Sequence, residues 1–323
     1  MGTRREFGLL TAAAISLAVA PGTVWAADKT VAITAIVEHP ALDACREGII
    51  EALAEAGYVE GENTEILFES AQGNPATAAQ IARQFVGEEP DVIVPISTPS
   101  AQAVVAATSN IPVVFTAVTD PVGAKLVSDP DQPGGNVTGM SDLSPIGLHL
   151  DLVRELAPDA TRLGVISNPG EANSVTLVNL IEELAPERGF EVVEASAPQS
   201  SAVLPAAQSL VGDVDVIYVP TDNTVVTALE AIVQVGTENG IPVIAGDTDS
   251  VPRGAVAALG FNYGDVGRQT GRMVAAVLNG ANPGTIPVEG VEITELHVNP
   301  SAADAMGVSL SDEILERAHT VIE

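Results

Sequence analysis

Polar loops that follow apolar runs hold most of the side chains in this sequence that could bind a small molecule. Ser97 and Thr98 follow one run, and Thr98 with Pro99 after it is typical of the first turn of a helix. A helix N-terminus presents unpaired backbone N–H groups and a partial positive charge, which suit a ligand carboxylate. Asp222 and Asp247 follow two later runs, and either carboxylate could hold an ammonium group. Together these loops predict a site for a zwitterion such as an amino acid, although each residue is also typical of an ordinary helix cap or turn.

Further polar candidates stand in the other loops of this kind. Glu38 follows the first run, Asn173 and Ser174 follow its counterpart in the second half of the chain, and Thr119 lies in the loop at 116–121. Aromatic residues make up only 3% of the chain, so those near the loops are candidate stacking partners. They are Phe115, Tyr218, Phe261 and Tyr263, and core packing is the better explanation for the first two.

No motif in the sequence indicates a catalyst. It has no GxSxG, P-loop or HExxH motif and no GxGxxG after its first strand, and the acids Asp247 and Asp249 come with no nucleophile. Cys45 is the only cysteine and cannot form an internal disulfide, and the four histidines lack metal-ligand spacing. We therefore expect binding rather than catalysis, with no catalytic residue, no metal site and no cofactor.

Length and charge narrow the class of protein. The chain has 323 residues, of which 46% are hydrophobic, and this indicates a globular protein of two domains. It carries 13 basic against 43 acidic residues, for a formal net charge of −30. Such an acidic protein repels nucleic-acid phosphates and anionic lipid headgroups. We therefore exclude nucleic acid as a partner and expect a small-molecule ligand.

Residues 1–27 have the layout of an export signal. Arg4 and Arg5 precede an apolar stretch that runs to residue 20, and Pro21 and the small residues Ala26 and Ala27 follow. The stretch is short for a membrane span, so removal of the signal is favoured over anchoring. The arginine pair fits the twin-arginine route and the general secretory route equally. The sequence predicts a soluble protein released into the periplasm.

Short β-branched runs alternate with alanine-rich amphipathic segments along the rest of the chain, which is typical of an α/β fold with a mostly parallel sheet. The first half predicts strands at 31–37, 64–68, 91–96 and 112–115 and helices at 41–56, 75–86 and 99–108. The second half repeats this order, with strands at 163–167, 191–193, 214–219 and 242–245 and helices at 173–187, 201–211 and 225–238. DVIV from Asp91 matches DVIYV from Asp215, and IPV recurs at Ile111 and Ile241. A duplicated domain is the simplest interpretation, and chance likeness between two valine- and alanine-rich stretches is the alternative.

The duplication predicts two similar open lobes with Rossmann-like parallel sheets. We place lobe 1 at residues 28–143 plus 263–290 and lobe 2 at residues 144–262 plus 291–323, because glycine- and proline-rich stretches mark the joins. The cleft between the lobes would face the carboxyl ends of the strands, where ligands bind in such sheets. Hinges of this kind let two lobes close around a ligand.

Several longer motifs fall at these same loops. They are EHPALD from Glu38, GYVEGEN from Gly57, VFTAVTDPV from Val114, PGGNVTGMSDLSP from Pro133, GEANS from Gly170, VPTDNTVV from Val219, AGDTD from Ala245 and GRQTGRM from Gly267. With these motifs in order over nearly the whole chain, the sequence closely resembles the ABC-transporter substrate-binding proteins of the tryptophan/tyrosine-uptake type, which are similar to class I periplasmic binding proteins. The resemblance implies two lobes joined by a three-crossover hinge, an amino-acid-like ligand in the cleft, and delivery of that ligand to an ABC permease with its ATPase.

Carried over residue by residue, the resemblance implies ligand contacts at Glu38, Ser97, Thr98, Thr119, Asn173, Ser174, Asp222 and Asp247. The stretch after Ala258, LGFNYGDVGRQ, departs from the family pattern because it lacks paired tyrosines. The ligand thus stays open between an aromatic amino acid, a branched-chain amino acid and a nucleobase. We expect a monomer without enzymatic activity. The alternatives are a sensory ligand-binding subunit and, behind it, an exported small-molecule hydrolase.

Overall fold

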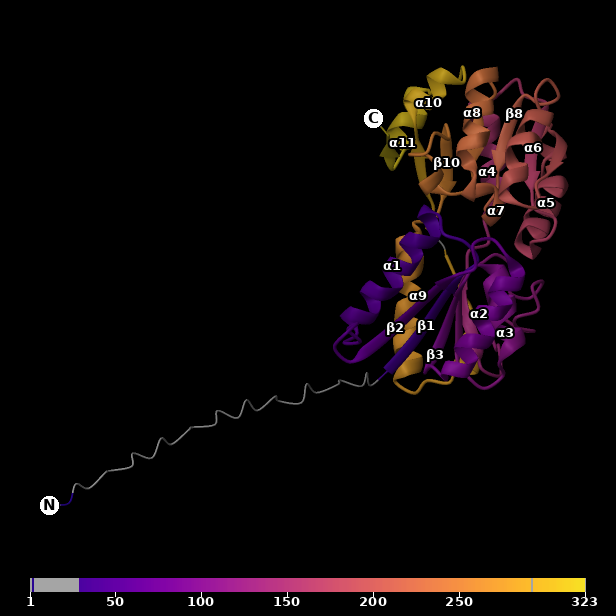
Figure 1. The fold of residues 1–323 in the computed structure, drawn as a ribbon. Helices are drawn as coiled ribbons and strands as arrows, with labels where there is room; N and C mark the ends of the chain where they lie inside the picture. The colour runs from indigo at the N-terminus through magenta and orange to yellow at the C-terminus, as the bar shows by residue number, and fades with distance from the viewer. Residues whose placement is uncertain (1, 3–28, 292, 323) are drawn as a thin grey trace.

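The computed structural model describes residue 2 and residues 29–291 and 293–322, which form two α/β lobes stacked end to end (Figure 1). Each lobe is built on one mostly parallel sheet with flanking helices. The predicted α/β class with two Rossmann-like lobes is therefore confirmed. The predicted export signal at residues 1–27 lies outside the described residues apart from residue 2, and it stays a prediction.

The lobe at the start of the chain has a six-stranded parallel sheet with the order β11-β5-β4-β3-β1-β2. Its strands are β1 (Lys29–Ala35), β2 (Thr64–Ser70), β3 (Val92–Ile96), β4 (Val113–Val118), β5 (Val137–Ser141) and β11 (Glu289–Gly290). Helices α1 (Pro40–Glu55) and α9 (Tyr263–Leu278) cover one face, and α2 (Pro75–Glu88) and α3 (Thr98–Ala107) cover the other. Strands β3 and β4 are buried along their whole length, as expected for parallel strands covered on both faces.

The other lobe has a seven-stranded sheet with the order β13-β12-β10-β9-β8-β6-β7, in which β12 runs antiparallel to β10. Its strands are β6 (Arg162–Ser167), β7 (Glu191–Ser196), β8 (Val216–Val219), β9 (Val243–Ala245), β10 (Ala257–Gly260), β12 (Glu295–Val298) and β13 (Thr320–Val321). Its helices are α4 (Ile146–Leu156), α5 (Ala172–Leu184), α6 (Val203–Ser209), α7 (Asn223–Thr227), α8 (Leu229–Asn239), α10 (Pro300–Ala305) and α11 (Asp312–Arg317). Leu163, Ile217 and Val243 of three neighbouring strands are completely buried in its core.

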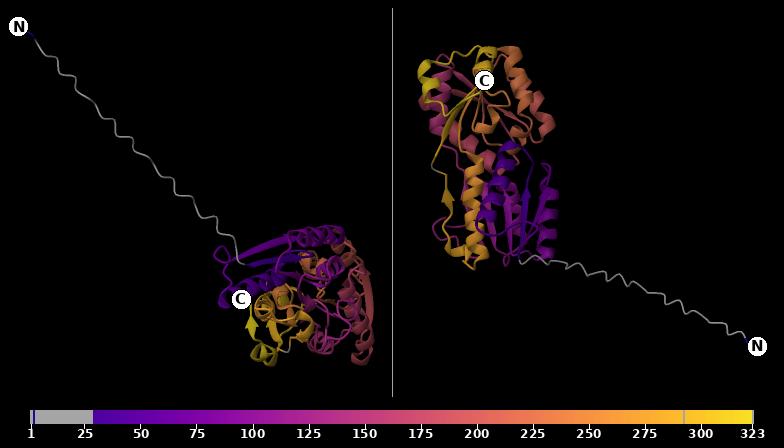
Figure 2. Two further views of the ribbon diagram at one scale, coloured as in Figure 1. Left: turned by 90° about the horizontal axis from the view of Figure 1, so that it is seen from below. Right: turned by 90° about the vertical axis from the view of Figure 1, so that its left-hand side faces the viewer.

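The two sheets share one strand order. The neighbours β2-β1-β3-β4-β5 of the first sheet correspond to β7-β6-β8-β9-β10 of the second. The chain passes between the lobes after β5, after β10 and after β11. Figure 2 shows the last passage running along the side of the molecule between β11 and β12. The carboxyl ends of both sheets therefore meet where the passages lie.

Some predicted elements differ from those observed. The helix predicted at 225–238 is two helices, α7 and α8, because Asp222 caps α7 through the backbone N–H of Val225 and the helix breaks at Ala228, whose φ is −114°. The helix predicted at 201–211 is a short 3₁₀ turn, η2 (Ser200–Ala202), followed by α6. The sequence-based prediction did not include β5, α4 and β10, which lie at the passages between the lobes.

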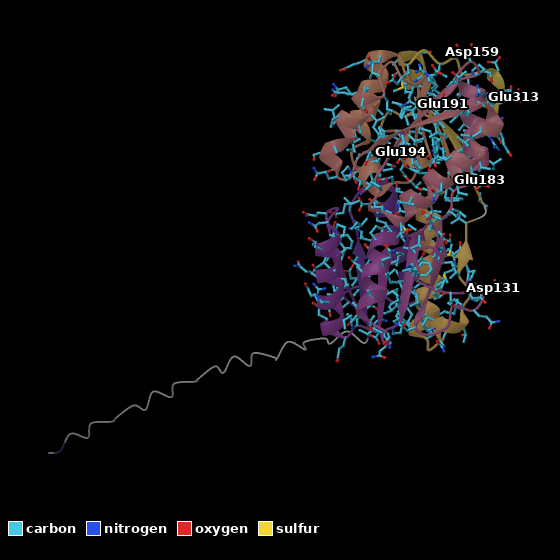
Figure 3. All side chains as sticks on the ribbon, turned by 90° about the vertical axis from the view of Figure 1, so that its right-hand side faces the viewer. Asp131, Asp159, Glu183, Glu191, Glu194 and Glu313 are labelled. Atoms are coloured by element: carbon cyan, nitrogen blue, oxygen red, sulfur yellow. The ribbon has the colours of Figure 1, made fainter. Side chains whose placement is uncertain are left out.

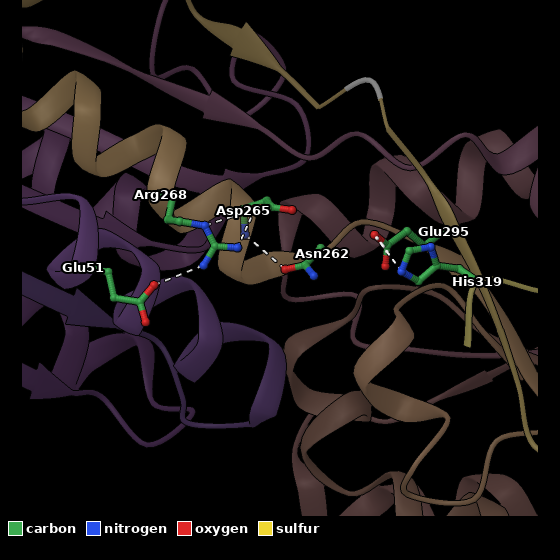
Figure 4. Close-up of polar contacts among 6 residues, drawn as sticks. All are labelled: Glu51, Asn262, Asp265, Arg268, Glu295 and His319. Carbon is green, nitrogen blue, oxygen red and sulfur yellow. Dashed lines mark hydrogen bonds and ion pairs between the residues drawn. The ribbon is translucent and has the colours of Figure 1, made fainter. Parts of the chain in front are cut away.

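Helices α1 and α9 lie side by side with their backbones in contact (Figure 1). A Cβ atom added at Gly267 would lie 2.0 Å from the carbonyl oxygen of Cys45, and one added at Gly48 would lie 2.2 Å from that of Gly264. Arg268 of α9 also reaches Glu51 of α1, with 3.1 Å between Nη1 and Oε2 (Figure 4). Because α9 follows the second lobe in the sequence, this packing joins two distant parts of the chain within the first lobe.

Acidic side chains are spread over both lobes. Figure 3 labels Asp131 on the first lobe and five others on the second, and all six are exposed: Asp131, Asp159, Glu183, Glu191, Glu194 and Glu313. The negative charge is thus not gathered at one face in this view.

Candidate ligand-binding site

A narrow cavity lies between the lobes, at the carboxyl ends of strands from both sheets. The first lobe lines it with His39, Ala41, Leu42, Ala117, Thr119, Asp142 and Tyr263, and the second with Asn173, Thr221, Asp222, Asn223, Val226 and Asp247. Ligands bind at this edge in open α/β sheets. The cavity has a volume of about 20 Å³, which is room for about one water molecule. The lobes must therefore move apart before anything larger can occupy it.

Three carboxylates but no lysine or arginine are found among the described residues that line the cavity. Asp142 comes from the first lobe, Asp222 and Asp247 come from the second, and all three are buried. A buried carboxylate is costly unless a cation or several hydrogen-bond donors compensate it. The cavity therefore suits a ligand that carries a positive charge.

Asp222 is held in place by three donors. Oδ2 accepts hydrogen bonds from the backbone N–H of Asn168 and the hydroxyl of Ser174, each at 2.6 Å, and Oδ1 accepts from the backbone N–H of Val225 at 3.0 Å. Burial and the nearby Glu171 carboxylate raise the pKa of Asp222, and the three hydrogen bonds act against this rise. Ser174 thus acts on the site through Asp222.

Asp142 has one oxygen paired and one free. Oδ2 accepts a hydrogen bond from the Tyr263 hydroxyl at 2.8 Å, whereas Oδ1 is buried and has no partner among the described residues. Burial raises the pKa of Asp142 to about 6, although the hydrogen bond from Tyr263 lowers it. The unpaired oxygen gives the cavity an acceptor for a ligand N–H.

Asp247 also caps a short helix, η3 (Thr248–Ser250). Its carboxylate accepts from the backbone N–H of Ser250 at 2.9 Å and from the Ser250 hydroxyl at 2.6 Å. Burial raises the pKa of Asp247. Burial and the charge of Asp247 raise the pKa of Asp249 to about 6. All these carboxylates are therefore more easily protonated than ordinary surface acids.

His39, Asn223 and Glu171 form a chain of contacts across the interface between the lobes. His39 and Asn223 line the same cavity from opposite lobes, and Asn223 Nδ2 donates to Glu171 Oε2 at 2.6 Å. Glu171 also accepts from the backbone N–H and the hydroxyl of Thr224, at 3.2 and 2.7 Å. Burial, helped by the positive charge of Arg253, lowers the pKa of His39 to about 3. The imidazole is therefore neutral at ordinary pH.

Several buried polar atoms at the cavity have no hydrogen-bond partner among the described residues. They are His39 Nδ1, Asp142 Oδ1, Asn173 Oδ1 and Thr221 Oγ1. Buried polar atoms are usually paired, and an unpaired one costs about 1–3 kcal/mol. Four of them around one cavity indicate a site shaped for a polar ligand.

The structure brings four of the eight predicted site residues to the cavity: Thr119, Asn173, Asp222 and Asp247. Ser174 lies behind Asp222. Glu38 is exposed and lies in a second groove between the lobes, where Arg46 Nη1 is 3.7 Å from its Oε1. The contribution of Glu38 to binding stays a prediction.

Ser97 and Thr98 are buried at the start of α3, but they do not line the cavity. Their hydroxyls have no hydrogen-bond partner in the described part of the chain. Ser97 has a φ of 80° and Ala117, at the end of the neighbouring strand, has a φ of 52°. Such conformations are rare for residues other than glycine and gather at functional sites. Helix α3 also approaches α5 of the opposite lobe.

Sequence reasoning missed His39, Asp142, Thr221 and Asn223 as lining residues. Tyr263 was predicted only as a stacking partner, whereas its hydroxyl holds Asp142. Asp142 follows a glycine-rich stretch whose local pattern does not predict a strand. The predicted core positions of Phe115 and Tyr218 are confirmed, since both are completely buried.

Two of the histidines that the sequence places far apart are neighbours. The rings of His297 and His319 stack with 5.9 Å between their centroids. Glu295 Oε2 lies 3.2 Å from His297 Nε2. Figure 4 shows the contact on the other side, where Glu295 Oε1 lies 3.6 Å from His319 Nε2. Within residues 29–291 and 293–322, no group of three or more His, Cys, Asp or Glu side chains is placed to hold a metal ion. No helix in these same ranges is both long and apolar enough to cross a membrane.

The chain is similar to known proteins along nearly its whole length. Residues 30–322 match the family model for ABC transporter substrate binding proteins. A tyrosine-binding protein of Clostridioides difficile (strain R20291) is 44% identical over 278 residues, which are 86% of this chain and 81% of that protein.

Two solved structures bear on the conformation. An ABC domain from Streptococcus pneumoniae in complex with L-Trp is 32% identical and superposes with a TM-score of 0.88, over 92% of this chain and all of the other. The ligand-free, open structure of a substrate binding protein with adhesive properties from Clostridium difficile is 41% identical, yet its TM-score is 0.69, over 91% of this chain and 99% of the other. The lobes of the present structure are therefore arranged more as in the L-Trp complex than as in the open form.

Proposed function

The chain belongs to the ABC transporter substrate-binding protein family, and we propose that it carries an amino acid, in the first place an aromatic one, in the cavity between its lobes. The observation that carries this proposal is the cavity itself, with three buried carboxylates, several unpaired polar atoms and no lysine or arginine among its described lining residues. The tyrosine-binding relative and the L-Trp complex support an aromatic ligand.

The ligand ammonium group binds among the carboxylates. Asp142 Oδ1 is the oxygen that has no hydrogen-bond partner among the described residues, so it is the first acceptor for the ammonium. Asp222 and Asp247 approach from the other lobe and already hold several donors. An ammonium shared between the lobes would hold the closed form together, because its contacts are lost when the lobes separate.

The ligand carboxylate binds at the start of α3, which does not line the cavity of the present structure and joins the site when the lobes move apart. The first N–H groups of a helix lack intrahelical acceptors, and the buried hydroxyls of Ser97 and Thr98 are also unpaired. Asn173 stands at the start of α5 on the facing lobe, where its Nδ2 donates to Glu171 Oε2 and to the Thr221 carbonyl, so the atom that it offers a ligand N–H is the unpaired acceptor Oδ1. The strained backbone at Ser97 supports a functional role for this turn.

Closure of the lobes completes the cycle of binding and delivery. We place the hinge where the chain passes between residues 28–143 plus 263–290 and residues 144–262 plus 291–323. The ligand-bound, closed form is presented to an ABC permease with its ATPase, and no covalent bond is broken. The protein acts in the periplasm as a monomer after removal of residues 1–27.

Calorimetry of the purified protein with L-tyrosine, L-tryptophan, L-phenylalanine, L-leucine and adenine tests the proposal. We expect saturable binding of at least one aromatic amino acid. Asp142→Asn keeps an acceptor for Tyr263 but removes the charge, and we expect its affinity to fall by at least ~30-fold, as for a buried charge pair worth about 2 kcal/mol or more. Glu65→Gln removes an exposed charge on β2 and should bind as the wild type does. Unchanged affinity in Asp142→Asn would refute the ammonium site, and no saturable ligand would refute the function.

A further inference from the structure

We propose that His39 determines ligand specificity: its Nδ1 accepts a hydrogen bond from a hydroxyl or ring N–H on the ligand side chain. The proposal rests on the proposed function, since it assumes an amino acid in the cavity. It adds that the site prefers a side chain with a donor to an apolar side chain of the same shape. The phenol of tyrosine and the indole of tryptophan are two side chains that carry such a donor.

The position of His39 at the start of α1 leaves its ring available to a ligand. His39 is the N-cap residue of α1, with φ −157° and ψ 162°, and Pro40 follows it at the first helical position. An N-cap side chain ordinarily accepts a hydrogen bond from the first turn. The His39 side chain makes no such bond, is 9% exposed, and lines the cavity instead.

The groups around the neutral His39 ring favour one of its two tautomers. Asn223 Nδ2 donates to Glu171 Oε2 at 2.6 Å, so the Asn223 amide is oriented with its oxygen available to His39. His39 Nδ1 is buried and has no partner among the described residues, and the Asn223 oxygen is an acceptor for a proton on the other ring nitrogen. We therefore assign the ring proton to Nε2, which leaves Nδ1 with a lone pair for the cavity.

The charges around His39 select a neutral donor over an ammonium group. Asp142, Asp222 and Asp247 line the same cavity and are far stronger partners for a cation than a neutral imidazole. The positive charge of Arg253 acts on His39 from the second lobe, where Arg253 is paired with Glu230 at 2.7 Å. A second cation at His39 would meet this repulsion. A hydroxyl or a ring N–H would not.

The preference should be measurable because a ligand without a donor leaves Nδ1 buried and unpaired. A site that hydrogen-bonds a ligand group discriminates against the analogue that lacks it more sharply than an apolar pocket does. We expect the wild-type protein to bind L-tyrosine at least tenfold more tightly than L-phenylalanine if a phenol is the donor. If an indole is the donor, we expect the protein to bind L-tryptophan at least tenfold more tightly than 3-benzothienyl-L-alanine, in which sulfur replaces the ring N–H.

Calorimetry with these four ligands on the wild type, His39→Phe and His39→Asn tests the proposal. His39→Phe keeps an aromatic ring without an acceptor, and we expect it to lose the preference by weakening the donor ligand while leaving its analogue unchanged. His39→Asn restores a short acceptor and should recover part of the preference. Melting curves of the variants show whether each is folded.

The outcomes separate the two proposals. Equal wild-type affinity within both ligand pairs would overturn the role of His39 and leave the proposed function standing. A wild-type preference that persists in folded His39→Phe would also overturn it. If none of the four ligands binds the wild type, the aromatic ligand itself is refuted and this inference falls with it. Should His39→Phe fail to fold, the wild-type pairs together with His39→Asn decide.

Discussion

The buried Asp142 carboxylate predicts that ligand affinity falls as the pH falls. Burial raises the pKa of Asp142 to about 6, so in the ligand-free protein the group is ionised at pH 8 and mostly protonated at pH 5. A ligand ammonium binds the ionised form. Binding at pH 5 therefore requires the loss of a proton, and this loss weakens the apparent affinity.

The size of the effect follows from the pKa. With a pKa of about 6, about one molecule in eleven has Asp142 ionised at pH 5, against nearly all at pH 8. The dissociation constant should therefore rise about tenfold between pH 8 and pH 5 from Asp142 alone. Burial also raises the pKa values of Asp222 and Asp247, so tenfold is the lower bound.

Stability of the ligand-free protein should change in the opposite direction. The pKa of Asp142 is higher in the folded protein than the ordinary value of 3.8. Its contribution to stability is therefore fully present below about pH 4 and is lost as the pH rises through about 6. A difference of about two pKa units corresponds to about 3 kcal/mol. Compared with Asp142→Asn, the ligand-free wild type should thus gain stability as the pH falls from 7 to 5.

Calorimetry and melting curves between pH 5 and pH 8 measure both effects. Titrations in buffers of different ionisation enthalpy should show net proton release on binding near pH 6. Asp142→Asn should show weaker binding at pH 8 and a flatter pH dependence, whereas Glu65→Gln should follow the wild type. Affinity that is constant or rises toward pH 5 in the wild type would refute the reasoning.

Three further substitutions test the packing and the hydrogen bonds of the site. Gly267→Ala places a Cβ 2.0 Å from the Cys45 carbonyl oxygen, so it should lower the free energy of unfolding measured in urea by about 3 kcal/mol or more. Gly87→Ala is the control, because Gly87 lies on helix α2 with open space around it, and this substitution should raise the free energy of unfolding by about 0.5–1 kcal/mol. Ser174→Ala removes the 2.6 Å hydrogen bond to Asp222 and should cost about 1.5–3 kcal/mol of stability in the same assay; an unchanged midpoint would contradict this. Tyr263→Phe removes the donor that lowers the Asp142 pKa, so the midpoint of the pH dependence of ligand affinity should move upward, and a downward shift would contradict the assignment.

The fold follows from local pattern more closely than the site does. The alternation of β-branched runs and amphipathic segments predicted both sheets, and the rule that ligands bind at strand ends led to Thr119, Asn173, Asp222 and Asp247, which line the cavity. Asp142 was missed because its position depends on the pairing of β5 with β4, a contact that local sequence does not encode.

The prediction of Glu38 instead of His39 missed the lining residue by one position. The two are adjacent, and the extended backbone at His39 turns successive side chains to opposite sides. Glu38 is consequently exposed while His39 is buried at the cavity. The positive φ angles of Ser97 and Ala117 had no signal in the sequence either, because neither residue is glycine.

The hydrogen bond between Tyr263 and Asp142 joins the first and second passages of the chain between the lobes, because Asp142 directly follows β5 and Tyr263 begins α9. The residue that would hold the charge of the ligand is thus part of the pivot about which the lobes turn. A bound cation would stiffen this pivot as well as bridge the lobes. If a bound ligand stiffens this hinge, amide hydrogen exchange should become slower along both connecting segments, including at residues that do not contact the ligand.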